Sequence, residues 1–339
     1  MDLAALNATA LKMVEPGKGL LAADESTGTI QKRFDAIGVE NTEPNRRAYR
    51  ELLFRAAEAM RHISGVILFR ETLYQDAADG TPLVRLIEQA GAVPGIKVDE
   101  GAKPMAGFPA ETLTEGLDGL PDLLAKAYER GARFAKWRAV ITIGKDLPSW
   151  GAVHANAHAL ARYAATCQDQ GLTPIVEPEV LMDGDHDIEV CERVTRHVLQ
   201  TVFAELNIQR VALEGMILKP NMIVSGLDCP VQAPVEEVAR RTVAVLKACA
   251  PAAVPGIAFL SGGQSDEQAT AHLDAMHRIG GLPWALTFSY GRALQHAPQT
   301  AWAGKPENVA AAQHAFAHRA RMNSLASLGR WEGVLERAA

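Results

Sequence analysis

The sequence contains few of the features that mark secreted or membrane proteins. Its 339 residues include four cysteines, Cys167, Cys191, Cys229 and Cys249, none in a CxxC spacing. We therefore expect reduced, mostly structural thiols. No apolar run reaches the length of about 18 residues that suggests a membrane helix, and the N-terminus lacks a charged region followed by an apolar one. These absences predict a cytoplasmic protein that neither enters a membrane nor is secreted.

Two further absences disfavour particular classes of function. The formal net charge is -6, so the chain has no excess of positive charge to attract nucleic acid, although a local basic pocket for a small anion is still allowed. No GxGxxG motif opens a predicted helix, which disfavours a dinucleotide-binding fold. The length suits one large barrel or two average domains.

Eight short apolar runs recur along the chain and alternate with segments of helical periodicity. Their hydrophobicity is continuous, which is typical of parallel strands covered on both faces. We therefore predict a single-domain α/β protein over 1–339, a (β/α)₈ TIM barrel with a helical extension over 1–17 and a helical tail over 318–339. The runs are GLLAADE, GVILF, GIKVDEG, RFAKWRAV, TPIVEPE, VALEGMILKPN, PGIAFLSGG and WALTFSYG. The clearest helical segments cover 45–61, 118–130, 153–170, 188–206, 234–248 and 267–280.

Lys219 ends one of these runs. The preceding residues, 211–218, are predicted to form a buried strand, and Pro220 prevents the strand from simply continuing. An amine delivered into a buried site near another positive charge loses its proton more easily and becomes a nucleophile. The alternative is a lysine that extends from the strand end to solvent.

Charged side chains follow most of the other runs, at the ends where barrel active sites form. Lys136 and Arg138 are two residues apart and should share one face of a strand, as should Glu177 and Glu179 on the next strand. We expect Lys136 to lower the pKa of Lys219. A buried ladder of ion pairs without catalysis is the alternative. The ends of the first and third runs add Asp24, Glu25, Ser26, Lys97 and Asp99.

Glycine-bearing loops follow the last two runs. Backbone N–H groups beside glycine can approach an anion closely, serine adds a donor, and an arginine can bind phosphate oxygens through two donors. The corresponding loops of barrels often bind phosphate, although each loop alone could be a tight turn. The residues concerned are Ser261, Gly262, Gly263, Ser289, Gly291 and Arg292.

Histidines are poorly placed for a metal site. The pairs His154 and His158, and His314 and His318, are four residues apart in alanine-rich segments that lie away from the strand ends, and neither pair has an evident third ligand. The acidic loop over 183–187 is more typical of a solvated turn. We expect no metal.

The motifs together resemble class I fructose-bisphosphate aldolases over nearly the full length. The matching segments, in order, are GKGLLAADESTGTIQKR, GVILFRETLYQ, GIKVDEG, FAKWR, PIVEPE, GDHD, LKPNM, FLSGGQS and PWALTFSYGRALQ. The resemblance implies that Lys219 forms a Schiff base with a sugar phosphate, with Glu177 as acid/base, Lys136 as the assisting cation and Asp24 acting at the C4 hydroxyl. It implies a C1-phosphate site at Ser261, Gly262, Gly263, Ser289, Gly291 and Arg292. The other phosphate would lie near Ser26, Thr29, Arg33 and Lys97, with Arg138 and Glu179 lining the cavity.

The resemblance also implies a cytoplasmic homotetramer in glycolysis and gluconeogenesis, with no cofactor, no nucleic-acid partner and no membrane partner. The chain departs from the family in lacking the C-terminal tyrosine of vertebrate members, in having Thr29 for a commoner serine and in having Glu100 for a frequent lysine. Two other functions stay open. They are another Schiff-base sugar-phosphate aldolase or transaldolase, and a non-catalytic scaffold, which the intact catalytic set disfavours.

Overall fold

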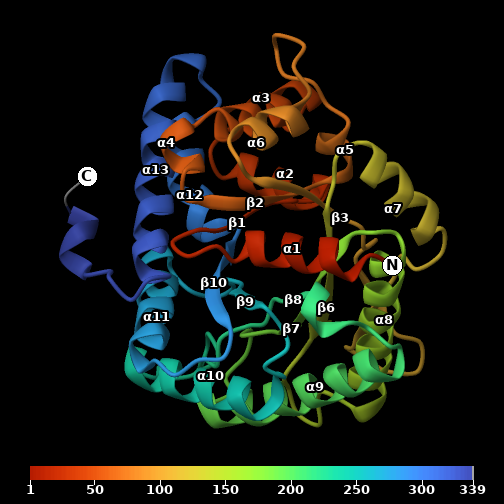
Figure 1. Cartoon of the computed structure of the whole chain (residues 1–339). Coiled ribbons are helices and arrows are strands. Elements are labelled where there is room, and N and C mark those ends of the chain that lie inside the picture. Colours follow the sequence, from red (N-terminus) through yellow and green to blue (C-terminus); the bar gives the residue numbers. More distant parts are fainter. Residues whose placement is uncertain (338–339) are drawn as a thin grey trace.

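The chain forms a closed barrel of parallel strands surrounded by helices (Figure 1). The structure is a computed structural model that describes residues 1–337. Within that range the strands of the barrel, in spatial order, are β1 (Gly19–Ala23), β2 (Ile63–Leu68), β3 (Val93–Lys97), β6 (Phe134–Ile141), β7 (Thr173–Val180), β8 (Ile217–Leu218), β9 (Gly256–Phe259) and β10 (Ala285–Tyr290), which returns to β1. A short antiparallel pair, β4 (Ala102–Pro104) and β5 (Thr112–Thr114), follows β3. The predicted (β/α)₈ barrel is confirmed.

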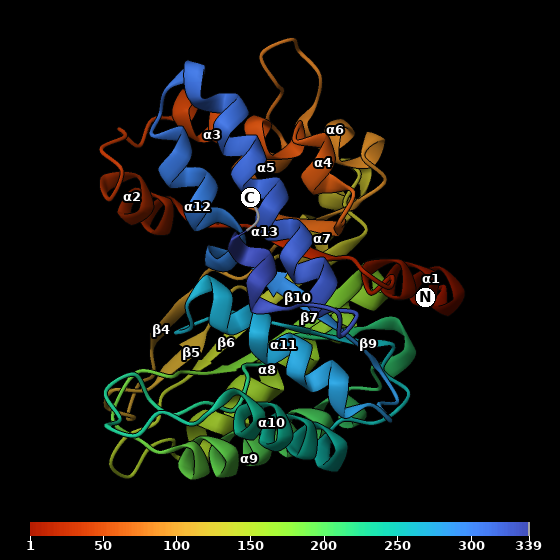
Figure 2. The same ribbon diagram turned by 90° about the vertical axis from the view of Figure 1, so that its left-hand side faces the viewer.

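Helices cover the outside of the barrel. Figure 2 shows α9 and α10 on one side of the strands and α3 and α12 on the other. None of the helices within residues 1–337 is both long and apolar enough to cross a membrane. The α-helices are α1 (Leu3–Met13), α2 (Thr27–Asp35), α3 (Glu43–Phe54), α4 (Ala57–Met60), α5 (Arg70–Leu73), α6 (Leu83–Gln89), α7 (Leu120–Glu129), α8 (Trp150–Asp169), α9 (Ile188–Ile208), α10 (Val235–Cys249), α11 (Asp266–Ile279), α12 (Arg292–Trp302) and α13 (Val309–Ala326). The 3₁₀ helices are η1 (Leu213–Gly215), η2 (Pro306–Asn308) and η3 (Gly333–Arg337).

The strands separate two apolar cores. The larger lies between the strands and the helices, and the smaller fills the barrel interior. In the interior, the Phe134 ring occupies the space beside Gly95, where a built Cβ would lie 2.2 Å from a ring carbon. Glycine at position 95 therefore makes room for the aromatic ring that fills the barrel.

Helix α1 closes the amino-terminal end of the barrel and lies across it in Figure 1. Its side chains Ala10 and Met13 are fully buried in the interior core. Two hydroxyls attach it to the strands, because Ser64 donates to the Met13 carbonyl over 2.5 Å and Thr173 donates to the Leu6 carbonyl over 3.0 Å. With its amino end covered by α1, the barrel has its polar cavity at the carboxyl ends of the strands.

Two predicted elements differ from the structure. The helix predicted over 45–61 is divided into α3 and α4, because Ala56 has a ψ of 79° that ends the helical path. The strand predicted over 211–218 is reduced to β8. The side-chain amide of Gln168 forms hydrogen bonds with the backbone of Ala212 and with the Gly215 carbonyl. These backbone groups are then not available to pair with a neighbouring strand, so the segment forms the 3₁₀ turn η1.

The C-terminal region packs on the outside of the barrel. Helix α13 contacts α11, α12 and α4, and η3 follows after a turn. Glu336 in η3 accepts hydrogen bonds from Arg319 over 2.5 Å and from the Trp331 indole over 3.0 Å. The tail predicted over 318–339 is thus divided between the end of α13 and η3, and residues 338 and 339 lie outside the described residues.

Candidate active site

The polar side chains at the carboxyl ends of the strands meet in one cavity of about 330 Å³. Asp99 at the end of the third run does not line it, whereas all the catalytic and phosphate-site residues that the resemblance implied do. They are Asp24, Ser26, Thr29 and Arg33 after β1, Lys97 on β3, Lys136 and Arg138 on β6, Glu177 and Glu179 on β7, Lys219 after β8, Ser261, Gly262 and Gly263 after β9, and Ser289, Gly291 and Arg292 at the end of β10.

Two lysines and two carboxylates form the buried centre of this cavity. The Lys219 Nζ lies 3.1 Å from Glu177 Oε1, and the Lys136 Nζ lies 2.9 Å from Glu177 Oε2 and 3.1 Å from Asp24 Oδ2. The contact between Lys136 and Glu177 Oε2 is an ion pair without good hydrogen-bond geometry. Glu177 Oε2 can therefore still accept a hydrogen bond from a ligand. The Glu177 carboxylate thus lies between the Nζ atoms of the two lysines, within proton-transfer distance of both.

Burial and charge act in opposite directions on these groups. Burial alone would raise the pKa of Asp24 and of Glu177, but the neighbouring Lys136 and Lys219 lower both values below their ordinary range. Burial would lower the pKa of Lys136, but Asp24 and Glu177 raise it above its ordinary value. At neutral pH both carboxylates are therefore ionised and Lys136 is charged. The effect of Lys136 on the pKa of Lys219 remains a prediction.

A second set of charges lies between this centre and the mouth. Arg138 pairs with Glu179 on the adjacent strand, and its side chain is 40% exposed. Lys97 lies 3.4 Å from Asp99 Oδ1. The period-two spacing on β6 has the expected result, because Lys136 and Arg138 face the cavity while Trp137 is fully buried in the outer core.

One wall of the cavity is suited to an anion. Gly291 is the N-cap of α12 and Arg292 its first residue, so a helix amino terminus and a guanidinium lie together. Ser289 Oγ is buried there and has no hydrogen-bond partner among residues 1–337. A buried hydroxyl without a partner that lines a cavity is suited to bind a ligand oxygen. The adjacent loop of Ser261, Gly262 and Gly263 completes this wall.

The neighbouring part of the cavity contains the amino end of α2, which follows β1, the strand next to β10. Ser26 caps this helix by accepting from the Thr29 N–H, and the two hydroxyl oxygens are 3.1 Å apart. Arg33 on the same helix pairs with Glu25. Glu25 also pairs with buried Arg50 over 2.6 Å. It lines the cavity, whereas the sequence assigned it no role beyond lying at a strand end. Ala22 and Leu260 are the other lining residues that sequence reasoning missed, because apolar residues carry no functional signal.

The histidines lie outside this cavity. His154 and His158 both contact Glu205, at 3.1 and 2.9 Å, and His318 contacts Glu336 at 3.1 Å. Within residues 1–337, no group of three or more histidine, cysteine or carboxylate side chains has a geometry that could hold a metal ion. The paired histidines therefore connect neighbouring elements of the outer shell.

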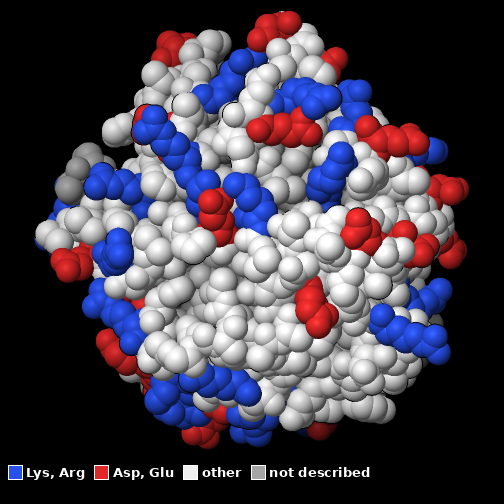
Figure 3. All heavy atoms as spheres, in the orientation of Figure 1, with Lys and Arg blue, Asp and Glu red and all other residues white. Residues whose placement is uncertain are grey.

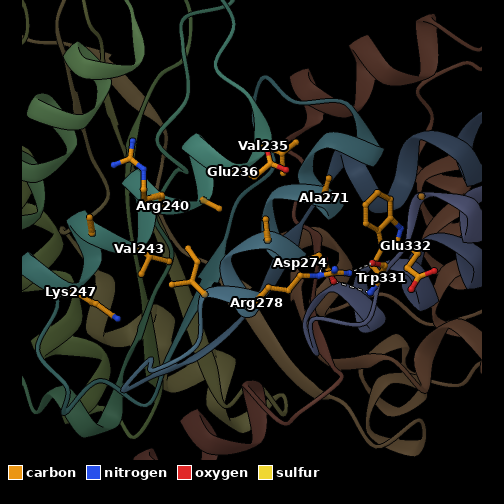
Figure 4. Close-up of a pocket in the computed structure, with 15 residues that line it drawn as sticks. Val235, Glu236, Arg240, Val243, Lys247, Ala271, Asp274, Arg278, Trp331 and Glu332 are labelled. Carbon is orange, nitrogen blue, oxygen red and sulfur yellow. Dashed lines mark hydrogen bonds and ion pairs between the residues drawn. The ribbon is translucent and has the colours of Figure 1, made fainter.

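A larger groove of about 1020 Å³ lies outside the barrel, between α10, α11 and the C-terminal segment (Figure 4). Its floor is apolar, with residues such as Val243 and Ala275. Arg278 at its edge is bound to Asp274 and to the Trp331 carbonyl. The face drawn in Figure 3 has acidic and basic side chains interspersed. The barrel cavity, although smaller, is where buried lysines, carboxylates and glycine-bearing loops meet.

Comparisons with known proteins agree with this geometry. A family model described as fructose-bisphosphate aldolase class-I matches residues 5–339. A probable class 1 fructose-bisphosphate aldolase of Xanthomonas campestris pv. campestris is 57% identical over 334 residues, covering 98% of this chain and all of the relative. The cytosolic fructose-bisphosphate aldolase 4 of Arabidopsis thaliana is 56% identical, covering 97% of this chain and 84% of the relative. A solved structure of Plasmodium falciparum fructose-bisphosphate aldolase, in complex with TRAP and a small-molecule inhibitor, superposes with a TM-score of 0.97 at 49% identity, covering 98% of this chain and 96% of that one.

Proposed function

The chain belongs to the class I fructose-bisphosphate aldolase family, and from that premise we propose that Lys219 is the residue through which it cleaves its substrate. The reaction is the reversible aldol cleavage of fructose 1,6-bisphosphate to dihydroxyacetone phosphate and glyceraldehyde 3-phosphate, a carbon–carbon lyase reaction of glycolysis and gluconeogenesis. The observation that carries the proposal is the buried side-chain nitrogen of Lys219, 3.1 Å from a carboxylate that also contacts Lys136.

The first half of the reaction requires an electron sink. Cleaving a bond next to a ketone leaves a carbanion, and a protonated imine delocalises its electrons better than a carbonyl does. Glu177 accepts the protons that the Lys219 nitrogen loses as it attacks C2 of the open-chain ketose, and passes them to the C2 oxygen, which departs as water and leaves the protonated imine. Lys136 keeps its charge beside Glu177, which stabilises the carboxylate between proton transfers.

The second half breaks the C3–C4 bond. Asp24, ionised because Lys136 and Lys219 outweigh its burial, accepts the proton of the C4 hydroxyl as the bond breaks and glyceraldehyde 3-phosphate leaves. The enamine that remains on Lys219 is protonated at C3, and hydrolysis of the imine releases dihydroxyacetone phosphate. We assign the C3 proton to Glu177 or a water that it holds.

Two walls of the cavity carry groups suited to bind the two phosphates of a bisphosphate. The wall with Ser261, Ser289 and Arg292 holds the C1 phosphate, and the wall with Ser26 and Arg33 holds the second phosphate. Gly262, Gly263 and Gly291 expose backbone donors on the first wall, and Thr29 and Lys97 contribute to the second. A transaldolase or another Schiff-base aldolase needs only one such wall, and the family match favours the bisphosphate enzyme.

Borohydride reduction tests the proposal directly. The protein is incubated with dihydroxyacetone phosphate and sodium borohydride, with and without EDTA, and the adduct is located by intact mass and peptide mapping. One adduct on Lys219, unaffected by EDTA, is expected. Lys247, in the outer groove, serves as an internal control and should stay unmodified. No adduct, or cleavage of fructose 1,6-bisphosphate that EDTA abolishes, would reject the Schiff-base mechanism.

We also propose a homotetramer assembled through the outer helices and a cytoplasmic location. Family membership supports the first, and the cytosolic Arabidopsis relative supports the second. Light scattering should give four times the chain mass of 36.4 kDa, and a tagged chain should fractionate with cytoplasmic markers. A concentration-independent monomer mass, or a membrane-bound or secreted fraction, would reject the respective proposal.

A further inference from the structure

The loop after β9 is held in place through Gln264, which is 5% exposed. The Gln264 N–H donates to the Ser261 carbonyl over 3.3 Å, which closes the turn that contains Gly262 and Gly263. The Gln264 carbonyl accepts from the Arg292 guanidinium, which connects this loop to the loop after β10. One residue therefore joins the two halves of the proposed C1-phosphate wall.

The Gln264 side chain is fixed by His272 on α11. The imidazole Nδ1 lies 2.6 Å from Gln264 Oε1, and both residues are buried. Because the amide oxygen accepts, Nδ1 carries the proton. Burial lowers the pKa of His272 to about 4, so the ring is neutral at physiological pH and keeps this tautomer. His272 does not line the substrate cavity, so it acts through Gln264.

The loop has little freedom to rearrange on its other side. A Cβ built on Gly263 would lie 2.0 Å from Met182 Cγ, and one built on Gly262 would lie 2.9 Å from Met182 Cε. Met182 thus packs tightly under the turn. A cavity of about 150 Å³ lies beside His272 and is lined by Gln264, Gln268 and Met182. Without the His272 contact, the Gln264 side chain could move into this space and carry the loop with it.

From this geometry we infer that His272 is a positioning residue for phosphate binding, because it holds Gln264 and thereby sets both the Ser261–Gly263 turn and the direction of Arg292. The inference rests on the proposed function, since it takes this wall to be the C1-phosphate site. It predicts a defect that depends on the phosphate of the ligand and not on Schiff-base formation itself.

The decisive experiment compares two ketones that differ only in the phosphate. Wild type and His272→Leu are trapped with borohydride across a concentration series of dihydroxyacetone phosphate, and separately of dihydroxyacetone. For His272→Leu, the concentration of dihydroxyacetone phosphate that gives half-maximal labelling should rise about two- to tenfold, the range expected for losing one buried hydrogen bond. Labelling by dihydroxyacetone should be unchanged.

Matched variants separate positioning from general damage. His272→Asn keeps a donor near the Nδ1 position and should restore most of the phosphate-dependent labelling. His277→Leu removes a histidine of the same helix whose Nε2 contacts the Leu286 carbonyl at 2.8 Å, away from the phosphate wall. It should leave the ratio between the two ketones at the wild-type value. In cleavage assays, His272→Leu should raise KM for fructose 1,6-bisphosphate while kcat stays near wild type.

The outcomes distinguish failure of the proposed function from failure of the positioning role of His272. Wild-type protein that forms no adduct with either ketone would reject the proposed function. A wild-type adduct on Lys219 combined with an equal loss of labelling by both ketones in His272→Leu would reject only the positioning role. If His272→Leu does not fold, Gln264→Met removes the other partner of the same hydrogen bond. It should show the same phosphate-dependent loss, and equal labelling losses for both ketones would again reject the role.

Discussion

The two ends of the barrel are built from the same strands but differ in chemistry. At the amino end, α1 packs Ala10 and Met13 against apolar strand residues such as Ile217. Two residues beyond Ile217 the same chain segment presents Lys219 to the cavity, beside Glu177. Because all the strands are parallel, one end collects every first residue and the other every last residue. Apolar packing at the amino end of the barrel stabilises the fold, so the charged side chains can collect at the carboxyl end.

This division predicts that substitutions at the two ends will have different consequences. Those at the amino end should lower the free energy of unfolding and leave the chemistry intact. Those at the carboxyl end should lower the rate, and their effect on stability should depend on whether a buried charge loses its partner. Lys219, the proposed Schiff-base residue, gives the largest expected effect.

Replacing Lys219 by methionine should lower kcat by at least about 10⁴-fold, because no other amine occupies this position to form the imine. Stability should change little, since Glu177 keeps Lys136 as its partner. Steady-state cleavage of fructose 1,6-bisphosphate and urea unfolding measure the two quantities. Lys219→Arg is the control that keeps the charge, and it should be equally inactive. Substantial activity in either variant would contradict the covalent mechanism.

Replacing Glu177 by glutamine should lower kcat about 10²- to 10⁴-fold, the usual contribution of a general acid/base. This substitution should also lower the free energy of unfolding. Lys136 and Lys219 both lose a carboxylate, and breaking a buried ion pair typically costs about 3–5 kcal/mol. Stopped-flow trapping and urea unfolding on the same sample test both statements. A kcat within tenfold of wild type, about 1.4 kcal/mol in barrier, would assign the proton transfers to another group.

Replacing Met13 by alanine tests the apolar end. Met13 is fully buried in the barrel interior, so its truncation should lower the free energy of unfolding by about 2–5 kcal/mol. The kcat and KM for fructose 1,6-bisphosphate should stay at their wild-type values in protein that remains folded. Leu11, 54% exposed on the same helix, is the matched control, and Leu11→Ala should cost much less. A fall in kcat for Met13→Ala would show that the two ends are coupled.

Most of the fold and site could be predicted because both depend on local sequence features. Continuous apolar runs identify strands buried on both faces, and the polar residues after each run must meet where the strands end. Lys136 and Arg138 are two residues apart, and in an extended strand this spacing alone puts both side chains on the cavity face. Barrel closure then brings Asp24, which is distant in sequence, to 3.1 Å from Lys136.

Other features depend on contacts between distant residues and leave no local signal. The shortening of the strand predicted over 211–218 results from the amide of Gln168, more than forty positions earlier. Glu25 looked like one more strand-end carboxylate, yet it joins Arg33 to buried Arg50. His272 lies in a helix without any motif. Only the folded chain shows that it holds Gln264.

Lowering the pH should destabilise the protein through the carboxylates at the charged end of the barrel, because the side chains of the interior core at the apolar end do not titrate. The pKa values of Asp24 and Glu177 are lowered in the folded chain, so their stabilising effect is complete above their unfolded values, about 4, and is lost as the pH falls through the lower folded values. The free energy of unfolding should therefore fall below about pH 4. Asp24→Asn should make this fall shallower, measured by urea unfolding at successive pH values. An unchanged slope would mean that folding does not lower the pKa of Asp24.

The smallest expected effect concerns Thr29, which lines the proposed second phosphate wall. Its hydroxyl lies 3.1 Å from that of Ser26 at the amino end of α2, where an anion is favoured. Thr29→Ser keeps the hydroxyl, so KM for fructose 1,6-bisphosphate should change by less than about twofold, whereas Thr29→Val should raise it about two- to tenfold by removing one hydrogen bond. Neither variant should alter stability appreciably, because the side chain is exposed. Equal KM values for the two variants would show that the hydroxyl does not contact the substrate. The charged end would then bind its second phosphate through Ser26, Arg33 and Lys97 alone.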